Sequence, residues 1–236
     1  MRKTRPVKIL FAASFMIALC CFLAACQAQA PQRTSLISGP RFAIDVKPGP
    51  EYDLVINILS IQTKRPPVMA CWLETVDGKY FDTIFVSRNV AKHTWYSAPA
   101  EGRPEALPIW THAAAQRNVD AVSGATPMAG SEIAGKAGTG IPAGTYTVKF
   151  EVNKSSDFNK SFPDKLPPGD SRFSGPNGQP SLLYTGTIRV GGGPASTMLE
   201  AKGTGSLRGT DGDVHSLDGM TTALGIVDSV MVSYRE

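Results

Sequence analysis

Residues 145–152 constrain the fold of this 236-residue chain more than any other segment. Four large apolar residues, from Tyr146 to Val152, alternate there with threonine, lysine and glutamate. Successive side chains of a β-strand point to opposite faces of the sheet, so this period of two predicts a strand with one buried and one polar face. A Pro-Ala-Gly turn at residues 142–144 leads into the strand.

Other short segments rich in β-branched and aromatic residues carry weaker forms of this pattern, separated by glycine and proline. Asp77-Gly78-Lys79 joins two of them and predicts a tight hairpin, because Asp-Gly is a preferred turn between paired strands. No helix of conventional length is required, although residues 109–118 predict one short helix. The further segments that predict strands are 42–46, 52–61, 68–76, 80–86, 182–190 and the end of 221–234.

These segments together predict an all-β fold, a single antiparallel β-sandwich of the immunoglobulin-like (Ig-like) type. Two stretches without periodicity, His93–Gly140 and Asn153–Ser181, are long loop insertions for such a sandwich. Loops of this length in a folded domain are usually functional or disordered, so a functional site is expected within them.

The N-terminal segment predicts export and lipid attachment. Four basic residues precede an apolar run, Ile9–Ala25, which ends in Leu23-Ala24-Ala25-Cys26. This order resembles the signal peptide and lipobox of bacterial lipoproteins. The resemblance implies that the Cys26 thiol receives a diacylglyceryl group and that Cys26 becomes the first mature residue. The domain organisation that follows is a signal peptide at 1–25, a flexible tether at 26–40 and a folded β-sandwich domain at 41–236.

Three other interpretations of this segment stay open, and the simplest is that Cys26 is an ordinary thiol. The apolar run, about 17 residues long, is at the short edge for a retained transmembrane helix. Ordinary signal cleavage after Ala30 is the third alternative, because Ala28-Gln29-Ala30 suits that peptidase. Gln27 resembles the sorting position of lipoproteins directed to the outer membrane. We therefore predict a lipid-anchored protein of the cell envelope, on the outer membrane and facing the periplasm.

Charge and cysteine content simplify once the signal peptide is set aside. The chain has 24 Lys and Arg against 20 Asp and Glu, and the whole excess lies in residues 1–25. The neutral remainder has no basic face, which argues against a nucleic-acid partner. Cys20 and Cys21 fall in the apolar run, so an acylated Cys26 leaves only Cys71 and no intrachain disulfide. Its apolar neighbours predict that Cys71 is a buried, unreactive thiol.

Catalytic patterns are not found in the sequence. The three histidines lie far apart, and neither a zinc-binding histidine motif nor a hydrolase serine motif occurs. We therefore predict no catalytic residues and no enzymatic activity. Asp211, Asp213 and Asp218 are candidate ligands of a divalent metal, since carboxylate oxygens close together suit such ions. The alternative is an ordinary turn rich in Asp and Gly.

Residues 120–127 read Asp-Ala-Val-Ser-Gly-Ala-Thr-Pro. They resemble the Ser-Gly-Ala-Thr-x-Thr sequence of covalently flavinylated FMN-binding domains, in which the second threonine carries the FMN. Met128 stands at that position and has no nucleophilic oxygen, so covalent FMN is not expected. The alternative is a turn in which Ser123 and Thr126 hydrogen-bond to nearby backbone.

A wider set of motifs lies between Pro67 and Val232. They are Trp72-Leu73-Glu74 before Asp77-Gly78-Lys79, Leu107-Pro108-Ile109-Trp110, Asp120 to Pro127, Pro142 to Tyr146, Gly178 to Tyr184, and Asp211-Gly212-Asp213 with Thr221 to Leu224. Their order and spacing resemble the DUF2271 family of predicted periplasmic proteins. The resemblance implies no established activity, and the genes near those of the relatives imply a setting of redox or metal handling. The Gly-His-rich residues of many relatives are missing here at Gly203–Ser206.

Two functional hypotheses follow. The first is a non-enzymatic binding or accessory lipoprotein, attached to the membrane through its lipid and contacting a ligand or a protein partner in the envelope. Its expected binding residues lie in the first long loop, because aromatic residues and arginine anchor interfaces; the alternative is that they pack this loop onto its own domain. The second hypothesis is a redox accessory that binds flavin or a divalent metal, although no cofactor is predicted outright. The candidate binding residues are Trp95, Arg103, Trp110, Asp120, Ser123 and Thr126.

Overall fold

The structure is a computed structural model that describes residues 41–52, 54–58, 61–95, 100, 102–115, 123–124, 132–135 and 140–236. The signal peptide, the tether, Cys26, Asp120, Thr126 and Met128 lie outside the described residues. Among the described residues, no helix is long and apolar enough to cross a membrane.

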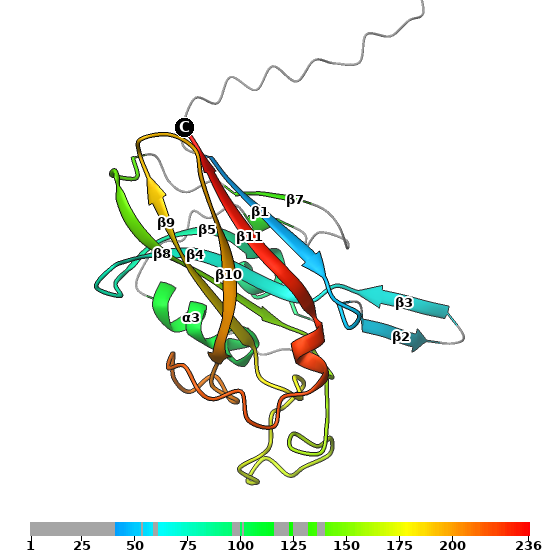
Figure 1. The fold of residues 1–236 in the computed structure, drawn as a ribbon. Coiled ribbons are helices and arrows are strands. Elements are labelled where there is room, and N and C mark those ends of the chain that lie inside the picture. Colours follow the sequence, from blue (N-terminus) through cyan, green and yellow to red (C-terminus); the bar gives the residue numbers. More distant parts are fainter. Residues whose placement is uncertain are drawn as a thin grey trace, which may run out of the picture. The chain divides into compact units, whose positions relative to one another are not determined.

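Nearly all described strands belong to one sheet, in the order β6-β5-β4-β8-β9-β10-β11-β1-β7 (Figure 1). Its neighbours pair antiparallel, except that the short β6 lies parallel to β5. A separate hairpin pairs β2 with β3. The strands are β1 Arg41–Pro48, β2 Leu54–Ile58, β3 Ile61–Arg65, β4 Val68–Thr75, β5 Tyr80–Ser87, β6 Ser123–Gly124, β7 Glu132–Gly135, β8 Gly144–Asn153, β9 Leu182–Val190, β10 Ala195–Thr204 and β11 Val227–Arg235.

The main sheet curls until its two edges approach each other. A Cβ atom added to Gly135 of β7 would lie 2.1 Å from Cγ2 of Ile84 in β5, so only glycine allows this approach. The curled sheet encloses an inner core to which β1, β4, β5, β7, β8, β9, β10 and β11 all contribute. The prediction of an antiparallel all-β fold is therefore confirmed. Two facing sheets of an Ig-like sandwich are not confirmed, because the described strands form one continuous, nearly closed sheet.

A second, outer core covers the other face of β4 and β5. It is formed by those strands with the short helices α2 Arg88–Ala91, η1 Pro104–Ala106 and α3 Pro108–Ala114. Both faces of β4 are consequently buried: Cys71 points into the inner core and Trp72 into the outer core. This explains the continuous apolar run from Val68 to Leu73. The predicted burial of Cys71 is confirmed, and desolvation raises the pKa of its thiol far above the usual value.

Glu151 of β8 lies on the face that the period of two marks as polar, yet its side chain is fully buried. The N-terminus of α3 covers it, and the carboxylate accepts hydrogen bonds from the backbone N–H of Trp110 at 2.8 Å and of Ile109 at 3.3 Å. The Ser181 hydroxyl donates a third bond at 2.6 Å. Burial raises the pKa of Glu151 to about 7, against the lowering effect of these donors and of the Lys149 charge.

Several predicted elements are confirmed. The Asp77-Gly78-Lys79 turn joins β4 to β5, with Gly78 at a φ of 79°. The short helix is present as α3. The predicted strand at 52–61 is instead the hairpin of β2 and β3, and β10 was not expected at all. Most residues of β10 are exposed or half-buried, so the strand carries little apolar pattern.

The strand registers define two ends of the sheet. Arg41 pairs with Arg235, and Ala195 pairs with Tyr234, so the start of β1, the end of β11 and the β9–β10 turn share one end. Residues 154–181 and 205–226 connect strands at the opposite end. Figure 1 shows this separation, with the C-terminal end of β11 at the top and those two connections at the bottom. We call these the β1 end and the loop end.

The buried carboxylate predicts a specific pH dependence of stability. The folded-state pKa of Glu151 is raised, so its contribution is full below about 4.5 and is lost as the pH rises through about 7. From the size of the shift, the free energy of unfolding should fall by roughly 3 kcal/mol over this range. Chemical denaturation of Glu151→Gln should lack this component. Glu200→Gln, the same change on an exposed position of β10, should retain it; equal pH profiles for both variants would contradict the assignment.

Candidate functional site

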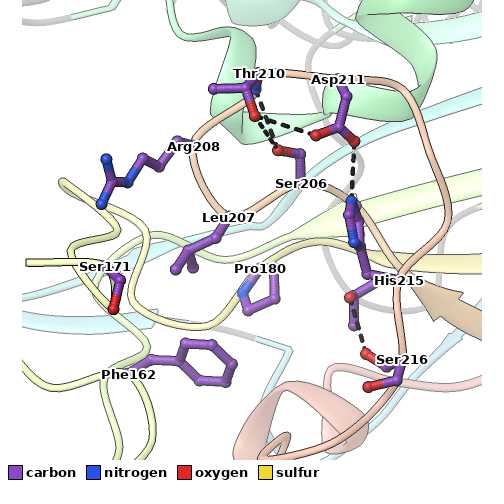
Figure 2. Close-up of a pocket in the computed structure, with 12 residues that line it drawn as sticks. Phe162, Ser171, Pro180, Ser206, Leu207, Arg208, Thr210, Asp211, His215 and Ser216 are labelled. Atoms are coloured by element: carbon purple, nitrogen blue, oxygen red, sulfur yellow. Dashed lines mark hydrogen bonds and ion pairs between the residues drawn. The ribbon is translucent and has the colours of Figure 1, made fainter.

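A cleft of about 360 Å³ lies at the loop end of the sheet (Figure 2). One wall is formed by Phe162, Ser171 and Pro180, which come from the connection between β8 and β9. The other wall consists of residues 204–208, 210–211 and 215–216, which follow β10. We call this second segment, residues 205–216, the cleft loop. The second predicted long loop, Asn153–Ser181, therefore does contribute to the cleft.

Backbone hydrogen bonds hold the cleft loop against the end of β10. Thr204 and His215 exchange two bonds, of 3.0 and 2.8 Å, and the Thr204 hydroxyl donates to the carbonyl of Ser216 at 3.0 Å. Gly203 makes this return possible, because a Cβ atom there would lie 2.4 Å from the carbonyl oxygen of His215. The backbone position of His215 is thus set by the sheet itself.

The cleft loop is also fixed to the helices of the outer core. His112 of α3 donates from Nε2 to the carbonyl of Gly209 at 3.0 Å. Gly209 has a φ of 70°, and a Cβ atom there would lie 2.5 Å from the backbone nitrogen of Glu105. Gly205 donates its N–H to the carbonyl of Ser181 at 3.1 Å. These contacts leave one side of the cleft loop, the side facing Phe162 and Pro180, as the cleft wall.

A chain of polar side chains runs along this wall. Ser206 bonds to Thr210 at 3.0 Å, and the Thr210 hydroxyl donates to Oδ2 of Asp211 at 3.1 Å. Oδ1 of Asp211 accepts from Nε2 of His215 at 2.9 Å and from the N–H of Asp213 at 3.1 Å. The bond from His215, ahead of the other donors, lowers the pKa of Asp211 to about 2, so this carboxylate is ionised at neutral pH.

Arg208 supplies a positive charge at the other side of the cleft. Its Nη2 donates to the backbone carbonyl of Asp170 at 2.6 Å, which is a neutral acceptor. The Asp170 carboxylate is held by Arg172 instead, through bonds of 3.1 and 2.9 Å. Within the described residues, Arg208 makes no ion pair. The hydrogen bonds and charge of Arg172 lower the pKa of Asp170, and the positive charge of Arg208 adds a smaller lowering effect. The cleft therefore combines one fixed, internally satisfied carboxylate with one cation that makes no direct ion pair with a described residue.

The candidate binding residues of the first long loop lie elsewhere. Arg103 donates to Glu105 at 2.9 Å, to Ser155 at 3.0 Å and to the Asn177 side chain, and its guanidinium lies 4.6 Å from the ring centroid of the half-buried Trp95. These contacts join the two long loops to each other. Trp110 is buried in the outer core, where its Nε1 donates to Thr83 at 2.9 Å. The structure therefore places Trp110 inside the domain and not on its surface.

The remaining candidates are not brought together. Asp120 and Thr126 lie outside the described residues, and Ser123 is described only as a backbone partner of Val86 in β6. Asp211 lines the cleft, whereas Asp218 accepts a bond from Ser216 at 2.9 Å. Among the described residues, no three His, Cys, Asp or Glu side chains form a group suited to a metal ion, so Asp211, Asp213 and Asp218 do not make such a site.

The cleft residues Arg208 and His215 were not identified from the sequence. They lie in a Gly-, Asp- and Ser-rich stretch whose composition predicts a turn. The spacing of Asp211 and His215 carries no recognised motif, because their contact depends on the return of the cleft loop to β10. Only the concentration of Asp and Ser with a single histidine in residues 203–219 could have drawn attention to them.

Comparison with known proteins gives one match. The model of a family described as "Predicted periplasmic protein (DUF2271)" matches residues 51–161. This confirms the resemblance predicted from the sequence, over a range that starts earlier and ends sooner than Pro67 to Val232. No curated protein and no solved structure matches the chain. The matched range contains Glu151 and α3, while the cleft residues follow it, starting at Phe162.

The close approach at Gly203 predicts the cost of a single methyl group. Gly203→Ala should force the His215 carbonyl away from β10 and destabilise the fold by about 1–3 kcal/mol, the usual cost of overpacking. Gly144→Ala is the matched control, since the nearest atom to its added Cβ is the Tyr146 ring at 3.7 Å. Thermal unfolding followed by circular dichroism measures both. Equal melting temperatures for the two variants would show that the cleft loop is not anchored at Gly203.

Proposed function

We propose that this chain, whose residues 51–161 belong to the DUF2271 family of predicted periplasmic proteins, is an envelope lipoprotein that acts as a non-enzymatic binding module. Diacylglyceryl attachment to Cys26 holds it on a membrane, and the residues from 26 to 40 form the tether. The β domain binds its ligand in the cleft at the loop end. The ligand is either a small molecule or part of a protein partner in the envelope.

The place of the cleft on the sheet carries this proposal. The tether is continuous with β1, which begins at Arg41, at the β1 end of the sheet. The cleft lies at the opposite end, beyond the last residues of β8 and β10. A tether over 26–40 spans at most about 50 Å, at roughly 3.5 Å for each extended residue. The chain that leads to β1 therefore joins the domain at the end of the sheet opposite the cleft.

The hydrogen bonds in the cleft favour binding over catalysis. A hydroxyl nucleophile needs to donate its proton to a neighbouring base. The hydroxyls of Ser206 and Thr210 form a chain that ends at Asp211, whose lowered pKa of about 2 makes it a weak base, and neither hydroxyl bonds to His215. Asp211 in turn has its oxygens occupied by donors from its own loop. The groups are arranged as a rigid polar wall, which is the usual requirement for selective ligand binding.

The lipid anchor is tested by changing one atom. Cys26→Ser removes the thiol, so the variant should not incorporate labelled fatty acid and should keep its signal segment. Cys71→Ser is the control, because that thiol is buried in the inner core and takes no part in anchoring, and it should be labelled and processed normally. Metabolic labelling with mass measurement of the purified proteins measures both. An unchanged protein that carries no label and keeps its signal segment would favour a transmembrane helix instead.

The cleft is tested by filling it. Ser171→Trp places a large side chain at an exposed position of the cleft wall, whereas Ser196→Trp makes the same change on exposed β10, away from the cleft. Protein purified from its native host should carry a ligand detectable as added mass by native mass spectrometry. Ser171→Trp should lose that mass and Ser196→Trp should keep it. The same added mass on both variants would place the ligand outside the cleft.

A further inference from the structure

We infer that the cleft recognises an organic carboxylate that has an apolar group and an N–H donor beside it. A peptide C-terminus and a free N-acyl amino acid share this chemistry. This inference rests on the proposed ligand-binding role of the cleft and names the class of ligand. Three features carry it: a cation that makes no direct ion pair with a described residue, an apolar middle and an oriented hydrogen-bond acceptor.

The cation is Arg208, which makes no direct ion pair within the described residues, although its charge acts on the nearby Asp170 carboxylate. Its bond to the Asp170 carbonyl restrains the guanidinium, while Arg172 occupies both carboxylate oxygens of Asp170. The other carboxylate of the cleft, Asp211, is already satisfied by His215, Thr210 and the N–H of Asp213. Arg208 keeps further N–H donors on a planar fork, a geometry that matches a carboxylate.

The middle of the cleft is apolar. Figure 2 shows Leu207 and Pro180 between Arg208 and Ser171 on one side and Asp211, His215 and Ser216 on the other. Phe162 adds an aromatic ring to the same wall. An aliphatic side chain placed here loses water-exposed surface, which adds to binding in proportion to the area covered. The volume of about 360 Å³ is at the small end for ligand sites and suits one residue with its flanking groups.

The far side offers a hydrogen-bond acceptor with a fixed direction. Nε2 of His215 donates to Asp211, so in the neutral form of the ring the acceptor lone pair lies on Nδ1. No described residue donates to Nδ1. The bond to Asp211 orients the ring, and the backbone bonds to Thr204 hold the backbone of His215. An amide N–H adjacent to the apolar group is the donor that complements Nδ1.

The experiment uses small probes with the complete mature chain, residues 26–236 with Cys26→Ser, in calorimetric titrations. N-acetylleucine should bind, and N-acetylleucinamide, which has no charge, should bind at least about tenfold more weakly. N-acetylglycine, which has no apolar side chain, should also bind more weakly. Titrations of the peptide Ala-Ala-Ala-Leu, with a free or an amidated C-terminus, distinguish a peptide C-terminus from a free N-acyl amino acid as the ligand. Tighter binding of the peptide with a free C-terminus than of N-acetylleucine assigns peptide C-termini.

Arg208→Gln should weaken the binding of N-acetylleucine about tenfold or more. Arg189 is an exposed arginine at the β1 end, so Arg189→Gln should leave this affinity unchanged. The comparison of acid and amide on the unchanged protein does not depend on how the variants fold. Equal binding of acid and amide, no binding of any probe, or full binding by Arg208→Gln would each overturn the inference. If the native ligand is nevertheless lost in Ser171→Trp, the cleft remains a binding site and only the carboxylate class is wrong.

Discussion

The buried carboxylate of Glu151 is the interaction on which the loop end depends. It accepts from two N–H groups at the start of α3 and from Ser181, just before β9 begins. The first N–H groups of a helix have no hydrogen-bond partners within the helix. A carboxylate at that position accepts hydrogen bonds from them, and its negative charge interacts favourably with the helix dipole. One side chain of β8 therefore fixes both a short helix and the return of the second long loop to the sheet.

The cleft is built on this arrangement. Gly205 donates to the Ser181 carbonyl, and a Cβ atom on Gly205 would lie 2.5 Å from the Ser181 hydroxyl and 3.0 Å from Oε1 of Glu151. The cleft loop thus begins in direct contact with the buried carboxylate and its partner. It then contacts α3 through His112 and returns to β10 through His215. Each wall of the cleft is attached to an element whose position depends on Glu151 or on the sheet.

Local pattern was sufficient where buried and more exposed residues alternate, as in β1 and the first part of β8, or where turn chemistry is specific, as at Asp77-Gly78. It was insufficient where burial depends on contacts distant in sequence. The alternation of 145–152 locates the strand, but it cannot show that α3 covers Glu151. Trp110 has the same appearance in sequence whether it anchors a partner or fills a core, and its place in the outer core follows from how α3 docks. β10 has Leu199 as its one large buried side chain, so its pairing with β9 and β11 decides that it is a strand.

Contacts that the overall composition does not show also explain why the cleft carries local charges although the net charge is zero. Residues 26–236 are neutral by composition, but neutrality of the whole does not require that each cation has a nearby anion. Asp170 is held by Arg172 from two residues away, and Asp211 is held by His215 from four residues away. Both carboxylates are thereby engaged by their own segments. Arg208 makes no direct ion pair within the described residues, although its charge acts on Asp170, so its guanidinium keeps N–H donors for the anion of a ligand.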